Sequence, residues 1–221
     1  MSSSAAPRRG VCLVLASAPG GGKSSTARRL LDAEPGLSLS VSATTRPPRP
    51  GEAEGVHYFF RTPEAFEAMA ARGEFIEHAS FLGRRYGTPR APVEAALASG
   101  RDVLFDIEWQ GHRLLRAALP GDVVGVFLLP PSLGELERRL RGRAQDAEAE
   151  IARRMAAARE ELRHWDEFDH VLVNDEFEAT VAAVRAVLHA ERCRRARQPG
   201  LAAFVGGLLG EGGASEALPP P

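Results

Sequence analysis

The chain contains a glycine-rich turn between residues 17 and 24 whose residue types could hold the phosphates of a nucleotide. It follows the form G-x-x-x-x-G-K-[ST], with Gly22, Lys23 and Ser24 at its end and Ser17 in the place of the first glycine. Glycines let the backbone take positive φ and approach a phosphate closely, so that successive N–H groups point at the anion. Lys23 would then reach the outer phosphates, and Ser24 would offer its hydroxyl to Mg²⁺.

An ordinary glycine-rich turn between a strand and a helix is the alternative interpretation of this imperfect match. Against it, Lys23 is the only lysine among the 28 lysine and arginine residues of the chain. A compact ammonium and a broad guanidinium are not interchangeable in a tight phosphate cradle, so a lysine at this position favours the phosphate loop. The residues expected to bind a nucleoside triphosphate are Ser17, Ala18, Pro19, Gly20, Gly21, Gly22, Lys23, Ser24 and Ser25.

Two strand ends could add polar groups to the same site. Asp106 follows the apolar residues 103–105, and an acid at the end of such a strand holds Mg²⁺ directly or through water. Glu108 would project to the same side as Asp106 if the strand continued. Asn174 ends the apolar run at 171–173, and ligands of open α/β sheets bind at the carboxyl ends of the strands. We expect Ser24 and Asp106 to bind the metal.

A proline-rich loop carries two arginines that could bind another phosphate. Prolines 47, 48 and 50 stiffen the segment and would hold Arg46 and Arg49 in a fixed relation. Two guanidinium forks on a rigid loop suit bidentate capture of a phosphate. A solvated polar loop is an equally good interpretation of the residues alone.

The elements that would position these groups alternate between apolar strands and amphipathic helices, as in a parallel α/β fold. A capping box at Ser132 and Glu135 predicts one helix start, and Thr62 followed by Pro63 predicts another. Strands are expected at 11–15, 37–41, 56–60, 75–79, 102–107, 123–129 and 171–173, and further helices from the glycine turn to residue 33, from 87–89 to 100, and from 177.

Arginines are concentrated between residues 138 and 154, where Gly142 and a polar turn with Asp146 as the next helix cap interrupt two helical patterns. Charge runs usually lie at the solvated surface, so pairing with Glu148, Glu150 and Glu160 is the favoured interpretation. A mobile helical pair that closes over phosphates is the alternative.

Composition limits the other classes of function. The formal net charge of −1 gives no overall field that attracts nucleic acid or an anionic membrane. Cys12 and Cys193 offer neither a disulfide framework nor metal spacing. No apolar run approaches membrane-spanning length, and the first residues lack the apolar stretch of a signal peptide. We expect a soluble, cytoplasmic protein that binds small molecules, of unknown oligomeric state.

Several longer motifs, in this order along the chain, resemble those of guanylate kinase of the bacterial type. The resemblance runs from about residue 8 to residue 197. Its most specific part is SVSATTRPPRPGE at 40–52, and it continues with GEFIEHA at 73–79, YGTPR at 86–90, DIEWQG at 106–111, RLRGRAQD at 139–146 and VNDEF at 173–177.

The resemblance implies a P-loop NTPase core with a parallel sheet flanked by helices, a small α+β GMP-binding insertion and a helical lid. It further implies transfer of the γ-phosphoryl group of ATP, with Mg²⁺, to GMP. The implied segments are core at 1–41, 96–134 and 165–198, the GMP-binding insertion at 42–95 and the lid at 135–164. The tail at 199–221 lies outside the resemblance, and its content of glycine, alanine and proline predicts disorder.

Roles for single residues also follow from the resemblance. A carboxylate such as Glu77 can accept from the guanine N1–H and 2-amino group, a pattern that adenine does not offer. Arg143 and Arg154 would neutralise the transferring charge together with Lys23, and Asn174 would lie near the adenine of ATP. The residues implied to bind GMP are Ser42, Arg46, Arg49, Glu52, Tyr58, Glu77, Tyr86, Thr88, Asp106 and Glu108.

Three positions depart from the family pattern. Pro19 has no N–H to donate, Glu108 is one methylene longer than the usual aspartate, and Ala144 replaces a lid glycine. A catalytically inactive guanylate-kinase-like module that binds a phosphorylated peptide is the alternative function, and Lys23, Ser24 and Asp106 argue against it. A kinase for another small phosphorylated acceptor is the second alternative, and the guanine-selecting residues argue against that.

Overall fold

A five-stranded parallel sheet, described here from a computed structural model, forms the core of the chain. The structure describes residues 8–81, 83–143 and 148–210, without the side chains of residues 81 and 143. The strand order is β2-β7-β1-β8-β9. The central strand is buried along its whole length, as the continuous apolar run predicts. The strands are β1 (Cys12–Ser17), β2 (Leu37–Leu39), β7 (Asp102–Asp106), β8 (Val123–Leu129) and β9 (His170–Val173).

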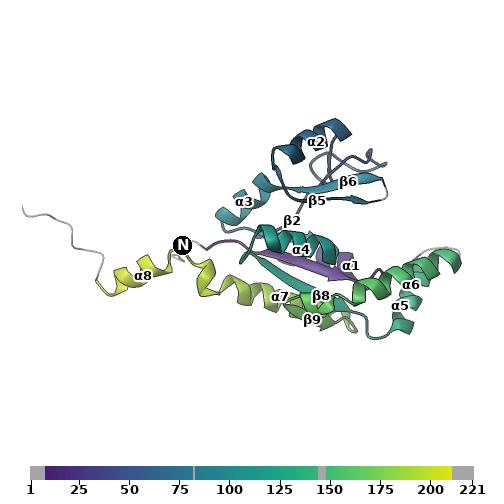
Figure 1. Ribbon diagram of the computed structural model, residues 1–221. Coiled ribbons are helices and arrows are strands. Elements are labelled where there is room, and N and C mark those ends of the chain that lie inside the picture. The colour runs from purple at the N-terminus through teal and green to yellow at the C-terminus, as the bar shows by residue number, and fades with distance from the viewer. Residues whose placement is uncertain (1–7, 82, 144–147, 211–221) are drawn as a thin grey trace, which may run out of the picture.

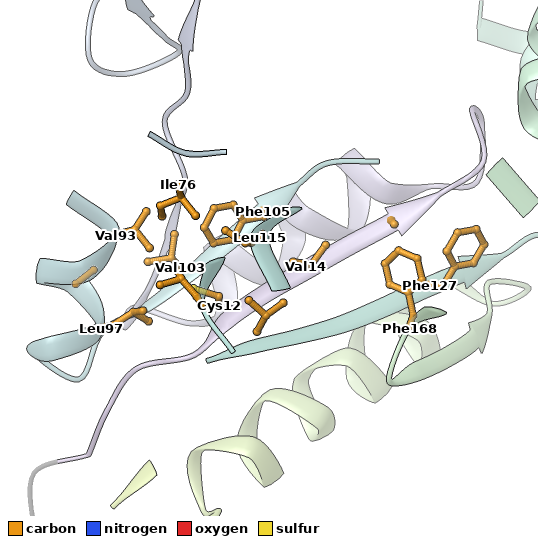
Figure 2. Close-up of a cluster of buried hydrophobic side chains, with 14 residues drawn as sticks. Cys12, Val14, Ile76, Val93, Leu97, Val103, Phe105, Leu115, Phe127 and Phe168 are labelled. Carbon is orange, nitrogen blue, oxygen red and sulfur yellow. The ribbon is translucent and has the colours of Figure 1, made fainter. Parts of the chain in front are cut away.

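Two layers of helices cover this sheet. On one face, Leu30 and Leu188 pack with the strand residue Leu13. On the other face, Leu97 and Leu115 pack with residues of the neighbouring strands, as Figure 2 shows. The first pair of helices is α1 (Lys23–Ala33) and α7 (Phe177–Arg192), and the second is α3 (Arg90–Ala98) and α4 (Trp109–Ala118).

A second, four-stranded sheet makes up the inserted segment and stands beside the core (Figure 1). Its strands lie in the order β4-β3-β6-β5, and one helix packs on it through Phe66 and Phe75. Ile76 joins the core cluster, so the insertion is packed against the core sheet as well (Figure 2). The elements are β3 (Ala43–Thr44), β4 (Phe59–Phe60), α2 (Pro63–Ala71), β5 (Phe75–Phe81) and β6 (Arg84–Pro89).

A helical pair, α5 (Leu133–Arg143) and α6 (Glu148–Leu162), lies beyond the end of β1, at the right of Figure 1. Leu136 and Ala158 of this pair pack against Ala18 of the glycine turn. Ser132 accepts a hydrogen bond from the Glu135 N–H at 3.1 Å, which is one half of the expected capping box. The expected pairing of arginines with glutamates is confirmed at Glu150 and elsewhere. Asp146 and Ala144 lie outside the described residues.

Three expectations for the insertion and its borders are wrong. Residues 87–89 belong to β6 and not to a helix, because cross-strand pairing with β5 overrides their turn-forming composition. The strand expected at 56–60 is reduced to β4, since Gly55 has φ 72° and closes a turn in which its N–H bonds the Tyr58 carbonyl. Strand β2 ends at Leu39, two residues before the expected end at residue 41.

Helix α4 was not expected from the sequence at all. His112 occupies a buried position on its inner face, where the pattern needs an apolar residue, and Gly111 precedes it. Strand β7 ends at Asp106, and Glu108 is the N-cap residue of α4. The idea that Glu108 continues the strand is therefore wrong.

The expected disordered tail contains an ordered helix, α8 (Leu201–Leu208), so that expectation is wrong for those residues. Local i→i+4 hydrogen bonds form it, among them Phe204 N–H to the Gly200 carbonyl at 3.1 Å. Within the described part of the chain, no helix combines the length and the apolar character needed to cross a membrane.

Candidate nucleotide site

The glycine turn leads from β1 into α1 with the backbone geometry that the residue types predict. Gly20 has φ 87° and Gly22 has φ 101°, a region that other residues rarely adopt. Gly22 is the N-cap of α1, and no side chain caps that helix start. The N–H groups of the first turn are therefore available to an anion.

Asn174, the residue after β9, stabilises this turn. Its side chain is 4% exposed, and its Nδ2 donates to the Gly21 carbonyl at 2.8 Å. A Cβ at Gly22 would lie 2.3 Å from that same Nδ2. Asn174 thus fixes the loop conformation from the neighbouring strand end, and its nearness to adenine stays a prediction.

Lys23, Ser24 and Asp106 meet at the carboxyl end of the sheet. Strands β1 and β7 are paired neighbours, so the end of β7 faces the first turn of α1. Lys23 Nζ lies 3.2 Å from Asp106 Oδ1 and donates to the Ile107 carbonyl at 3.1 Å. Ser24 Oγ donates to Asp106 Oδ2 at 2.9 Å.

The oxygens of Ser24 and Asp106 are hard donors of the type that Mg²⁺ prefers. Among the described residues, no group of three or more histidine, cysteine, aspartate or glutamate side chains could hold a metal by itself. This donor set fits Mg²⁺, which is commonly held by one or two protein oxygens while phosphates and water fill the other positions.

A cavity of about 540 Å³ lies between the core and the insertion. Half of its lining comes from each side, so neither part forms it alone. The core contributes Asp106, Ile107, Glu108, Gln110, Gly111 and Leu114, and the insertion contributes Ser42, Tyr58, Glu77, Ala79, Ser80 and Tyr86. We call it the acceptor cavity.

Glu77 faces the acceptor cavity from β5, and Thr88 holds it there from β6. The two residues are cross-strand partners, and Thr88 Oγ1 donates to Glu77 Oε1 at 2.7 Å. Burial raises the pKa of Glu77, and the bond from Thr88 works in the opposite direction. Thr88 is only 1% exposed and is not part of the cavity lining, so it contacts Glu77 from behind.

Glu52 organises the proline-rich loop. It bonds the Arg46 guanidinium at 2.7 Å and accepts from the Arg49 backbone N–H at 2.8 Å. The Arg46 side-chain hydrogen bond lowers the pKa of Glu52 to about 2. Arg46 also lies over the ring of Tyr58, 5.3 Å from its centroid, and so stands beside the acceptor cavity. The Arg49 residue is exposed at the loop surface.

A second cavity, of about 450 Å³, lies between the glycine turn and α6, and we call it the lid cavity. Pro19 and Gly20 line one side, and Arg154 lines the other while its Nε bonds Glu150 at 3.0 Å. The Arg143 side chain lies outside the described residues.

Two residues near these cavities were not expected from the sequence. Arg139 donates to the Asn174 carbonyl at 3.2 Å and lines a small pocket with Gly20, Gly22 and Ser25. Glu161 is a buried carboxyl in the lid cavity. Its position three residues after buried Ala158 is the one signal in the sequence that could have placed it on the inner face of α6.

Known proteins match nearly the whole length of this chain. The family described as "Guanylate kinase" matches residues 9–191. Proteins named guanylate kinase from Gluconobacter oxydans and Granulibacter bethesdensis are both 58% identical to this chain; they cover 90% and 91% of it, and 96% and 94% of their own lengths. The crystal structure of guanylate kinase from Anaplasma phagocytophilum aligns with a TM-score of 0.74 and 34% identity over 92% of this chain and 97% of that one.

Proposed function

The chain belongs to the guanylate kinase family, and on this premise we propose how its residues transfer the γ-phosphoryl group of ATP to GMP. The protein is a nucleoside monophosphate kinase, and the high identity over nearly full length does not favour a catalytically inactive module. The observation that carries the residue assignment is the acceptor cavity, which joins Glu77 to Asp106 and so brings the base-selecting group next to the phosphate loop.

We assign ATP to the glycine turn and the first turn of α1. The uncapped helix start and the positive-φ glycines support binding of the β- and γ-phosphates by backbone N–H groups. Lys23 would leave the Asp106 carboxylate and the Ile107 carbonyl, its present partners, to contact the transferring phosphoryl group. Pro19 supplies no N–H, and the Gly21 N–H already donates to the Ala18 carbonyl at 2.8 Å, so the donors in our assignment are Gly20, Gly22 and the residues after them.

GMP would occupy the acceptor cavity with its base against Glu77 and Ser42. The Glu77 carboxylate accepts from the guanine N1–H and 2-amino group, and Thr88 keeps that carboxylate in place. Arg46, Arg49, Tyr58 and Tyr86 would bind the phosphate, and Glu52 would position the two arginines. In this assignment Asp106 and Glu108 close the cavity on the core side.

Ser24 and Asp106 would hold Mg²⁺, which would supply neutralisation of negative charge on the phosphates of ATP. Phosphoryl transfer leaves a protein little covalent work, so the side chains position the two substrates in line and exclude water. The GMP phosphate is itself the nucleophile and needs no general base near neutral pH. Arg154, and Arg143 in the same lid, would stabilise charge on the transferring group. We place the reaction in the cytoplasm.

A coupled assay across a panel of nucleoside monophosphates tests this assignment. With ATP and Mg²⁺, the enzyme should phosphorylate GMP far faster than AMP, CMP or UMP. Comparable kcat/KM for AMP would show that Glu77 does not select the base. The same panel run on Glu77→Gln should show a loss confined to GMP, because the amide replaces one acceptor by a donor.

A further inference from the structure

The first turn of α4 is a wall shared by the two cavities. Glu108 and Gln110 line both the acceptor cavity and the lid cavity. A displacement of this turn would therefore change the shape of both cavities together.

Glu161 attaches the last turn of α6 to this wall. Its Oε1 accepts a hydrogen bond from the backbone N–H of Trp109, the first residue of α4, at 3.1 Å. The carboxyl is 6% exposed, and burial raises its pKa to about 7. The charged and titratable groups that face it are Glu108, Lys23 and His164. The first N–H groups of a helix have no partner within the helix, so Glu161 supplies the partner that the N-cap Glu108 does not.

A ring stack joins α4 to the chain just after α6, since His164 lies two residues beyond the end of that helix. The His164 ring lies 3.6 Å from the Trp109 ring, centroid to centroid, at an interplanar angle of 18°. Arg113 of α4 lies over the Trp109 ring at 4.5 Å. Arg113 and His164 both bond the carboxylate of Glu167, each at 2.6 Å. The end of the lid helix and the start of α4 are thus held as one unit.

We infer that Glu161 is a positioning residue that couples the lid to the acceptor cavity, so that a nucleotide in the donor site changes the affinity for GMP. The inference rests on the assignment of ATP and GMP to the two cavities proposed above. Lid movement around the donor phosphates shifts the end of α6, and the Glu161–Trp109 bond carries that shift to Glu108 and Gln110.

Titration calorimetry of GMP binding, with and without a saturating non-hydrolysable ATP analogue, measures this coupling. The wild-type enzyme should bind GMP about fivefold more tightly, or better, when the analogue is present. Glu161→Ala should lose most of this factor while still binding GMP. Glu161→Gln should keep it, because the amide oxygen still accepts from the Trp109 N–H. Glu161→Asp keeps the carboxyl group but is one methylene shorter, so it should not reach the Trp109 N–H and should behave like the alanine variant.

Asp166→Ala is the matched control, since it removes an exposed carboxylate near the same helix end and should leave the coupling factor unchanged. Absence of coupling in the wild type, or a retained factor in Glu161→Asp and Glu161→Ala, would overturn the inference. If Glu161→Ala does not fold, the contrast between the aspartate and glutamine variants decides. If Glu161 had only a structural role, its variants would have a lower melting temperature but the same ratio of GMP affinities with and without the ATP analogue. If the proposed function itself were wrong, the wild-type enzyme would bind GMP no better than AMP, a result that can be told apart from a loss of coupling.

Discussion

Replacing Thr88 by valine removes one hydroxyl from behind the guanine-selecting carboxylate and preserves the side-chain volume. The lost bond, 2.7 Å from Thr88 Oγ1 to Glu77 Oε1, is buried and has a carboxylate as its acceptor. Hydrogen bonds to charged groups contribute about 1.5–3 kcal/mol, which corresponds to roughly a 10- to 150-fold change in an equilibrium or rate. Burial already raises the pKa of Glu77, so loss of this donor should raise it further and disfavour the ionised form that accepts from guanine.

We therefore expect Thr88→Val to reduce kcat/KM for GMP by about one to two orders of magnitude, mainly through KM, with little change in KM for ATP. Thr88→Ser is the matched control, because it keeps the hydroxyl and should stay within about threefold of the wild type. The assay is initial-rate kinetics from pH 6 to 8, in which the valine variant should also need a higher pH to reach its maximum. A valine variant with wild-type kcat/KM for GMP would refute the role given to Thr88.

Glu108→Asp should leave GMP affinity unchanged or improve it, and a large rise in KM for GMP would show that the cavity depends on the longer side chain. Gly22→Ala should weaken ATP binding and destabilise the fold by about 1–2 kcal/mol or more, because φ is 101° and the new methyl would meet the Asn174 amide; calorimetry and chemical denaturation would measure both. Burial lowers the pKa of His112 from 6.5 to about 4, so the unfolded chain takes up a proton at a higher pH than the folded chain does. The free energy of unfolding should therefore be highest above pH 6.5 and fall as the pH drops toward 4. Between pH 7.5 and 5 the loss from this group is about 2 kcal/mol, and His112→Leu should show a correspondingly smaller difference in urea midpoints. Equal pH dependence in the two proteins would contradict the assignment to His112.

The donor half of the site could be predicted from the sequence because its determinants are local. Gly22, Lys23 and Ser24 are adjacent in the chain, and Asp106 ends an apolar strand. The parallel pairing of β1 with β7 then brings the strand end to the loop, as α/β topology requires. The placement of Asp106 3.2 Å from Lys23 follows from these few constraints.

The acceptor cavity could be predicted less well, because its shape depends on tertiary contacts that no local sequence pattern specifies. Gly87, Thr88 and Pro89 have the composition of a turn and a helix start, and only the tertiary pairing of β6 with β5 makes them a strand. The apolar pattern does not predict helix α4, because His112 fills a core position that an apolar residue usually takes. The sequence does not single out Glu161, since a glutamate among many charged residues does not reveal that the fold will bury it.

The most direct measurement of the central claim is the kinetics and GMP affinity of Lys23→Ala. Lys23 is assigned to the transferring phosphoryl group and lies outside the lining of the acceptor cavity, so its removal should act on the transition state. We expect kcat to fall by two or more orders of magnitude, while the Kd for GMP measured by calorimetry stays within about twofold of the wild type. An unchanged kcat, or a loss that appears only in GMP binding, would contradict the account.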